Sequence, residues 1–302
     1  MEQPLATTQT NTPSLSVLGR SLALMKPVTW FAPMWAFVCG AVASGGASWQ
    51  LSDIGRVFLG VLMAGPLLCG VSQVINDYFD REVDALNEPD RLIPSGRISL
   101  AQIAITILIL SLAGVAIAVV LGRGLAFLAA GGILLGLAYS APPLRAKRNA
   151  WFGNLLAGVT YEGFAWIAGH LAFAALTGPS ILLAVLYSLG THGIMSINDY
   201  KSIEGDKIAG INTIPVLYGT KTAAWMIVLT MDLVQLAVAA AFLIWGNPLA
   251  AAIIFGLVVV QFPIQRNFIR EPEANYLKFS AIGVNIFVWG MMVAAIGLRA
   301  VT

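Results

Sequence analysis

Long apolar runs dominate this chain of 302 residues and limit what it can fold into. About 20 consecutive apolar residues are needed for a helix to cross a bilayer. The runs are continuous and do not alternate with polar residues at a period of two, which argues against a membrane barrel. The sequence therefore predicts an all-α, polytopic membrane protein with nine transmembrane helices, at residues 28–48, 54–76, 99–121, 124–140, 151–176, 179–197, 223–245, 249–268 and 277–298.

The composition excludes an ordinary water-soluble domain. Hydrophobic residues make up 58% of the chain and charged residues only 11%, whereas an average soluble domain is about 25% charged. Cys39 and Cys69 fall in separate apolar runs, which is typical of packed thiols rather than of a disulfide or a metal site. Residues 1–25 are polar and lack the pattern of a cleaved export signal, so we expect a flexible cytoplasmic tail there and a single transmembrane domain over residues 26–302.

The basic residues indicate how the bundle is oriented. With nine spans the two ends of the chain lie on opposite sides, and loops rich in Lys and Arg are usually cytoplasmic. Of 17 basic residues, only Arg56, Arg123 and Arg299 fall on the side away from the N-terminus, which leaves 14 on the N-terminal side. We therefore expect a cytoplasmic N-terminus, and the lack of an organelle-targeting leader favours a bacterial inner or photosynthetic membrane.

Acidic residues gather in two short windows that repeat each other. Of 15 acidic residues, six lie within residues 77–90 and three within residues 199–206. The tetrapeptide Ile-Asn-Asp-Tyr occurs at 75–78 and again at 197–200, each time where an even-numbered span ends. Both windows should emerge on the cytoplasmic side, facing each other. The repeat is parallel, so that spans one to four match spans five to eight and span nine follows.

The first window carries a pattern suited to a cation. On a helix, Asp77, Asp80 and Asp84 lie within about 60° of one another, and Asn76 falls on the neighbouring edge. Three carboxylates at that density repel one another unless a cation neutralises them. An all-oxygen ligand set suits Mg²⁺, which typically binds one or two carboxylates together with phosphate oxygens.

The second window supplies fewer candidate ligands. Asp199 and Asp206 are nearly eclipsed if one helix continues through both, whereas Glu204 points away, and Gly205 could end the helix early. A simpler reading of either window is a set of helix-end charges that balance nearby bases, but two matching clusters favour a site. The predicted metal ligands are Asn76, Asp77, Asp80, Asp84, Asn198, Asp199 and Asp206.

Basic residues interleaved with the acids indicate a diphosphate ligand. A diphosphate carries several negative charges, which must be matched in the ground state and more strongly as it departs. Glu162 is a further candidate functional residue, because an ionisable side chain within a membrane span is usually functional. His170, His192 and Asp232 also lie within spans, where packing is the ordinary explanation. The predicted substrate-binding residues are Arg81, Arg91, Arg97, Tyr139, Arg145, Lys147, Lys201 and Glu162, with Arg148 in the same loop as Arg145.

These motifs resemble those of the intramembrane aromatic prenyltransferases of the UbiA superfamily. The likeness is carried by Asn-Asp-Tyr-Phe-Asp-Arg-Glu-Val-Asp at 76–84 and by the window at 198–206. Within the superfamily the sequence is most similar to the chlorophyll and bacteriochlorophyll synthases, through residues 87–99, 139–143 and 192–206. The resemblance implies nine helices around a central cavity, with two acidic motifs that hold Mg²⁺ and an isoprenoid diphosphate. The wider superfamily often has a further Asp where this chain has Ser202, so the number of ligands in the second motif stays open.

The resemblance also implies a reaction. The propionate of (bacterio)chlorophyllide attacks C1 of geranylgeranyl or phytyl diphosphate, and diphosphate leaves. A carboxylate is already an anion at neutral pH, so no general base is required. The barrier lies mainly in breaking the allylic C–O bond, which a metal ion and cationic side chains make easier. This interpretation makes Asp77, Asp80 and Asp199 the catalytic residues.

Two alternatives stay open at this point. A sibling prenyltransferase would handle metal and diphosphate in the same way but would transfer the prenyl group to a quinone precursor or to haem. A cation transporter would also use carboxylates, although ligands at one mouth and a parallel repeat speak against it. The expected partners are the isoprenoid diphosphate, (bacterio)chlorophyllide, the lipid bilayer and other pigment-biosynthesis or photosystem-assembly proteins, and no nucleic acid.

Overall fold

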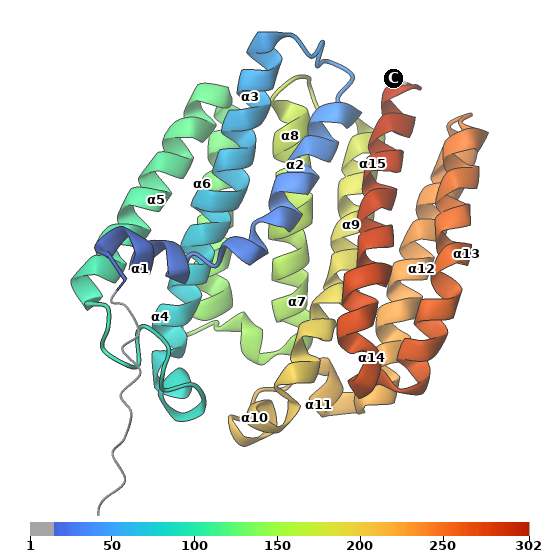
Figure 1. The fold of residues 1–302 in the computed structure, drawn as a ribbon. Helices are drawn as coiled ribbons and strands as arrows, with labels where there is room; N and C mark the ends of the chain where they lie inside the picture. Colours follow the sequence, from blue (N-terminus) through green and yellow to red (C-terminus); the bar gives the residue numbers. More distant parts are fainter. Residues whose placement is uncertain (1–14, 302) are drawn as a thin grey trace, which may run out of the picture.

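The chain folds almost entirely into helices. The computed structural model describes residues 15–301, and these residues form one bundle of long helices that stand side by side (Figure 1). The first half contains α1 (Val17–Leu24), η1 (Pro27–Thr29), α2 (Phe31–Ala43), α3 (Leu51–Leu62), η2 (Met63–Cys69), α4 (Gly70–Asn87), α5 (Leu100–Leu121) and α6 (Arg123–Ser140). The second half contains η3 (Ala146–Arg148), α7 (Ala150–Gly158), η4 (Val159–Phe164), α8 (Ala165–Leu171), α9 (Gly178–Met195), η5 (Ser196–Lys201), α10 (Ile203–Ile208), α11 (Ile214–Tyr218), α12 (Thr220–Ile244), α13 (Pro248–Arg270), α14 (Pro272–Phe279), η6 (Ser280–Val284) and α15 (Asn285–Arg299).

Each of the nine predicted spans coincides with a helical run in residues 15–301, but the runs differ in apolarity. Seven are long and apolar enough to cross a membrane, and the pair formed by α1–η1 and α2, bent by 60°, makes an eighth. The remaining run, residues 150–171, is not among them because Asn154, Glu162 and His170 interrupt its apolar side chains. All three of these residues are buried inside the bundle. The chain is thus a multi-pass membrane protein of the predicted all-helical class.

Part of the segment expected to be a flexible tail is helical. Residues 1–14 lie outside the described residues, whereas α1 begins directly after its capping residue, Ser16. Two contacts fasten α1 to α5: the Gln102 side chain donates to the first carbonyl of α1 at 2.7 Å, and the Ser21 and Thr106 hydroxyls are 3.0 Å apart. The expectation of a tail that runs to residue 25 is therefore wrong for α1, because its polar residues cap and anchor a helix.

Small residues bring α2 and α8 into close contact at the centre of the bundle. Gly40 on α2 packs on the backbone of Trp166, and Gly169 on α8 packs on the backbone of Phe37. A Cβ at either glycine would overlap a main-chain carbonyl oxygen of the other helix. Small residues are the usual way for membrane helices to approach closely, because lipid supplies little hydrophobic drive between them.

We expect Gly169→Ala to destabilise the bundle by about 1–3 kcal/mol, because backbone atoms of α2 cannot turn aside as a side chain would. The measurement is the unfolding transition of the purified protein in detergent. Gly256→Ala on α13 is the matched control, since a Cβ there meets nothing within 4 Å. Equal transitions for the two variants would contradict the packing described for α2 and α8.

Three of the spans contain a wide π-helical turn between two α-helical halves. These turns are η2 between α3 and α4, η4 between α7 and α8, and η6 between α14 and α15. A π turn inserts one residue, which rotates the helix beyond it by about 100° relative to an unbroken α-helix. The two halves of such a span therefore present different faces. In the first of them, α3 packs Gly60 on the Phe37 ring of α2. The acidic face of α4, beyond the π turn, points in a different direction from this packed face of α3.

Both acidic windows lie at the same end of the bundle, which we call the motif end. Figure 1 shows the end of α4 and the short helix α10 there, with the C-terminus at the opposite end. The arginines that the sequence assigns to the other side lie away from it. Arg56 donates to the carbonyls of Leu121 and Ala172, where α5 and α8 finish, and Arg299 donates to the carbonyl of Ala47. The acidic windows and the arginines assigned to the opposite side of the membrane thus lie at opposite ends of the bundle, as the sequence predicts.

Candidate active site

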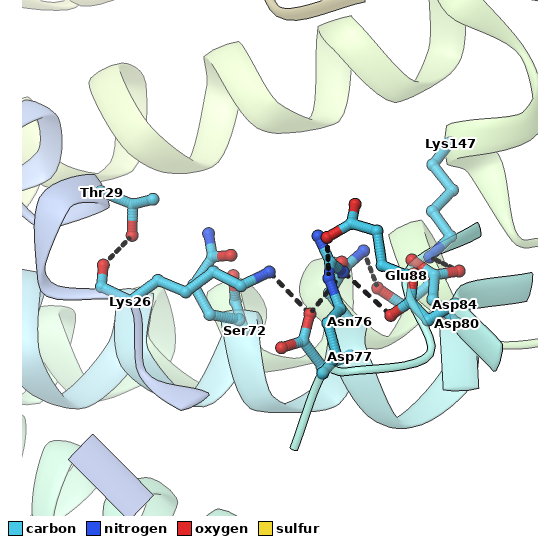
Figure 2. Close-up of polar contacts among 12 residues, drawn as sticks. Lys26, Thr29, Ser72, Asn76, Asp77, Asp80, Asp84, Glu88 and Lys147 are labelled. Atoms are coloured by element: carbon cyan, nitrogen blue, oxygen red, sulfur yellow. Dashed lines mark hydrogen bonds and ion pairs between the residues drawn. The ribbon is translucent and has the colours of Figure 1, made fainter. Parts of the chain in front are cut away.

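The helix α4 presents the first acidic window along one face. Because α4 is regular from Gly70 to Asn87, the spacing of Asp77, Asp80 and Asp84 brings their carboxylates to the same side. Their side chains are 9%, 23% and 13% exposed, so little of each carboxylate reaches solvent. Figure 2 shows this acidic face with Lys26 at one end and Lys147 at the other.

Two basic residues neutralise one part of this face. Lys26 Nζ lies 2.6 Å from Asp77 Oδ1. Arg91, in the loop after α4, lies 2.9 Å from Asp84, 2.7 Å from Glu88 and 3.8 Å from Asp77. The backbone of Lys26 is left-handed, with φ 47°, at the bend between α1 and α2. The sequence analysis did not single out Lys26; its only signal was its place as the last basic residue before the first span.

Two further bases, from the loop between α6 and α7, reach the remaining carboxylate. Arg145 Nη2 and Lys147 Nζ lie 3.2 Å and 2.5 Å from Asp80 Oδ1. With its amide turned so that both of its groups are satisfied, Asn76 donates to Asp80 at 3.2 Å and accepts from Lys147 at 3.0 Å. Burial lowers the pKa of Lys147, and the charge of Asp80 opposes that change. The loop between α6 and α7 therefore places two positively charged side chains against the acidic face of α4.

The second window does not form the continuous helix that its spacing suggested. Residues Ser196–Lys201 form a 3-10 helix, the chain breaks at Ser202 with φ −125° and ψ 11°, and α10 starts afresh at Ile203. The expected eclipsing of Asp199 and Asp206 on one helix is therefore wrong, and Gly205 lies inside α10 rather than ending a helix. The cause is local, because Ser202 turns the chain.

Ser202 also holds one of the two acids in place. Its hydroxyl donates to Asp206 Oδ2 at 2.8 Å. Burial raises the pKa of Asp206, while the Ser202 hydrogen bond and the charge of Lys201 oppose the rise. The charge of Asp206 acts on Asp199, so the two acids remain near each other despite the break. In contrast, Glu204 is 83% exposed and pairs with Lys207 at 2.8 Å, which agrees with its expected orientation away from Asp199.

Tyr139, in the last turn of α6, lies near one acid of each window. The charges of Asp199 and Asp80 both act on its hydroxyl group. An isolated backbone bridge between Asn149 and Asn212 joins the loop after α6 to the segment after α10. Asp80 of α4 and Asp199 of η5 thus both lie near Tyr139, and the loop after α6 contacts both Asp80 and the segment after α10.

Three predicted phosphate-binding residues do not reach the acidic face of α4 formed by Asp77, Asp80 and Asp84. Arg81 stacks on the Tyr78 ring, with its guanidinium 4.4 Å from the ring centre, and pairs with Glu82 at 3.5 Å. Arg97 is exposed and donates within its own loop, to Ser95 and to the Asp90 carbonyl. Lys201 is exposed next to the second window, where its charge acts on Asp199 and Asp206. These three remain predictions, because none contacts Asp77, Asp80 or Asp84 among the described residues.

Ionisable residues inside the spans mainly serve packing. Glu162 is buried in η4 with one carboxyl oxygen unpartnered, and it contacts neither acidic window. His170 uses both ring nitrogens, on Ser180 at 2.8 Å and on the Ala175 carbonyl at 3.1 Å. Asp232 accepts from the Gln265 side chain at 2.7 Å. The role of Glu162 in substrate binding remains a prediction.

Known proteins are similar to this chain in both sequence and fold. The model of the UbiA prenyltransferase family matches residues 27–295. The chain belongs to the UbiA prenyltransferase family. It is 56% identical over 283 residues to the "Bacteriochlorophyll synthase 34 kDa chain" of Chloroflexus aurantiacus, covering 94% of this chain and 91% of that protein. It is 41% identical over 283 residues to the chloroplastic chlorophyll synthase of Avena sativa, covering 91% of this chain and 75% of that protein.

A solved structure has the same fold. The UbiA homologue from Archaeoglobus fulgidus, bound to DMAPP and Mg²⁺, superposes with a TM-score of 0.67 at 21% identity, covering 92% of this chain and 99% of that one. The chain is therefore a prenyltransferase with the UbiA fold, as the motifs predicted.

The motif end of this UbiA protein fits a divalent cation by its chemistry. No three His, Cys, Asp or Glu side chains within residues 15–301 stand close enough together to form a ready metal site. In this structure, bases engage the carboxylates of the first window, as Lys147 engages Asp80 at 2.5 Å. The donor set of carboxylate and amide oxygens is nevertheless the set that Mg²⁺ prefers. The residues suit the ion once their basic partners turn toward phosphate oxygens.

Proposed function

We propose that this chain is a (bacterio)chlorophyll synthase, which esterifies the propionate of (bacterio)chlorophyllide with a geranylgeranyl or phytyl group. The observation that carries this proposal is the 56% identity to a bacteriochlorophyll synthase over 94% of the chain. The geometry supports it, because Arg145 and Lys147 reach Asp80, and the charges of Asp80 and Asp199 both act on Tyr139 at the motif end.

The reaction needs no proton transfer. A propionate oxygen forms a bond to C1 of the prenyl group, the bond from C1 to the diphosphate oxygen breaks, and diphosphate carries away the electron pair. Since the nucleophile is already an anion, the protein must bring two anions together and stabilise the charge that develops on the leaving group. Bases that reach the acidic face, such as Arg145 and Lys147, can transfer their hydrogen bonds from Asp80 to the diphosphate.

We propose Mg²⁺ as the cofactor of this site. When bound, the ion would polarise the diphosphate and neutralise part of its charge. The proposal is supported by the donor set and by the Mg²⁺ in the Archaeoglobus fulgidus homologue. Asp77, Asp80 and Asp199 are the proposed catalytic residues, acting as carboxylates. The residues proposed to hold the ion are Asn76, Asp77, Asp80, Asp84, Asn198, Asp199 and Asp206.

The proposed membrane placement follows from the positions of the bases. We propose that the motif end and the N-terminus are cytoplasmic, in a bacterial inner or photosynthetic membrane. The reason is that 14 of the 17 basic residues are assigned to the N-terminal side, and only Arg56, Arg123 and Arg299 to the other. Residues 26–302 would form one transmembrane domain with a parallel pseudo-repeat. Pigment-biosynthesis or photosystem-assembly proteins remain proposed neighbours in that membrane.

The decisive experiment offers the purified protein several acceptors. Chlorophyllide, bacteriochlorophyllide and 4-hydroxybenzoate are each supplied with labelled geranylgeranyl diphosphate or phytyl diphosphate. We expect label in a tetrapyrrole ester and none in the benzoate. Incorporation into the benzoate alone would favour the sibling quinone-precursor reaction. Cation flux in vesicles without any prenyl transfer would favour the transporter.

We expect Arg91→Gln to raise the KM for the prenyl diphosphate about tenfold, because one guanidinium then no longer joins Asp84 and Glu88. Steady-state rates over a range of diphosphate concentrations measure the change. Arg270→Gln, at the exposed end of α13, is the control and should leave the KM unchanged. An unchanged KM in Arg91→Gln would show that the loop after α4 does not shape the donor site.

A further inference from the structure

A groove opens between α6 and α7, next to the acidic face but outside it. Its volume is about 680 Å³, within the range of about 300–1,000 Å³ typical of ligand pockets. Apolar side chains that remain exposed contribute much of its wall: Leu144 is 71% exposed and Phe152 is 63% exposed. Arg145 and Arg148 line the same groove. It therefore combines a large apolar wall with two guanidinium groups.

The two guanidinium groups retain binding capacity in this structure. The exposed side chain of Arg148 makes no hydrogen bond or ion pair within residues 15–301. Arg145 donates through Nη2 to Asp80 and to the Phe79 carbonyl, but its buried Nε has no hydrogen-bond partner. An unpaired buried donor is costly, so a ligand that accepts from it is favoured. The groove thus fits an apolar ligand that bears an anionic acceptor group.

We propose that this groove binds the tetrapyrrole acceptor, with the macrocycle against the apolar wall and the propionate on Arg145 and Arg148. The inference rests on the proposed function and assigns the acceptor to a place in the fold. Complementary charge supports this occupant, because guanidinium groups donate pairs of hydrogen bonds that match the two oxygens of a carboxylate. The apolar wall matches a flat ring system of low polarity.

The loop between α6 and α7 divides its bases between the two substrates. Lys147 faces Asn76 and Asp80, on the side where the diphosphate is proposed to bind. Arg148 lines the groove, and Arg145 reaches both, with its Nη2 3.2 Å from Asp80. A carboxylate held on Arg145 Nε would therefore lie next to the proposed donor site, on the same guanidinium whose Nη2 contacts Asp80. This arrangement brings two anionic substrates together, which the reaction requires.

The test separates the KM values of the two substrates. In Arg148→Gln we expect the KM for chlorophyllide to rise about tenfold, as for the loss of one charged hydrogen bond, while the KM for geranylgeranyl diphosphate stays within about twofold. Arg266→Gln, an exposed arginine on α13, is the matched control and should change neither value. An unchanged KM for chlorophyllide in Arg148→Gln, or an equal rise for both substrates, would overturn the proposal.

A second pair of variants tests the groove by volume rather than by charge. Ala138→Phe fills it from α6, whereas Ala130→Phe adds the same ring to an exposed position on the same helix. Chlorophyllide fluorescence, titrated with protein in the absence of diphosphate, should show at least about tenfold weaker binding for Ala138→Phe only. Equal binding by the two variants would overturn the proposal.

Other outcomes identify which idea has failed. If the wild-type protein transfers no prenyl group to any tetrapyrrole, the proposed function fails, whatever the variants do. If wild-type turnover is normal but Arg148→Gln loses only a dependence on phosphatidylglycerol in the vesicle, the groove is a lipid site and the acceptor proposal is overturned.

Discussion

Asp80→Asn should reduce prenyl transfer at least about a hundredfold while leaving the protein folded. The carboxylate of Asp80 is the one that both Arg145 and Lys147 reach, and the turned amide of Asn76 also contacts it. Figure 2 shows Lys147 beside Asp80. The amide of asparagine keeps the shape but removes the charge that a divalent cation and these bases require. Turnover with chlorophyllide and geranylgeranyl diphosphate measures the loss, and the detergent unfolding transition verifies the fold.

The control for this variant is Glu82→Gln on the same helix. The Glu82 side chain is 85% exposed and, within residues 15–301, its carboxylate pairs with Arg81 alone, at 3.5 Å, so its neutral form should keep nearly full activity. Full turnover by Asp80→Asn would contradict the assignment of the first acidic window to the reaction. A large loss in Glu82→Gln would indicate that activity follows the overall charge of α4 rather than particular carboxylates.

Removal of divalent metal should abolish activity almost completely, by about a hundredfold or more. The proposed ligands are all oxygen atoms, and such sites release Mg²⁺ readily to a chelator. Purified protein is dialysed against EDTA, assayed, and assayed again after Mg²⁺ is restored; recovery of the rate is expected. Ca²⁺ should restore less, because it prefers a larger and looser ligand shell. Undiminished turnover with residual metal well below the protein concentration would refute the role proposed for the ion.

Local periodicity predicted the first acidic window well. The residues between Gly70 and Asn87 favour an uninterrupted helix, so the spacing of Asp77, Asp80 and Asp84 translated directly into one face. The same reasoning failed for the second window. There the chain breaks at Ser202, and only the packed structure shows that its hydroxyl engages Asp206.

Contacts between distant parts of the chain lay beyond sequence reasoning. The pairing of Lys26 with Asp77 depends on a left-handed backbone at the bend before α2, and no periodic pattern announces it. The π turn at Met63–Cys69 is also invisible to hydropathy, because the run stays apolar through it. Runs of apolar residues gave the spans, but the tertiary contacts of these segments decide which way their polar side chains point.

The ion pairs of the first window have a thermodynamic consequence. Within the described residues, and apart from the pair of Arg81 with the exposed Glu82, four acids meet four bases, so this group carries no net charge; its members are Asp77, Asp80, Asp84, Glu88, Lys26, Arg91, Arg145 and Lys147. Diphosphate binding alone would have to separate these bases from their carboxylates and leave the carboxylates unpaired. Mg²⁺ binding alone would occupy the carboxylates and leave the bases unpaired. Each ligand releases the partners that the other requires, so their affinities should be reciprocally linked. The free magnesium level in the cell would then govern how tightly the isoprenoid tail is captured as well as how fast it reacts.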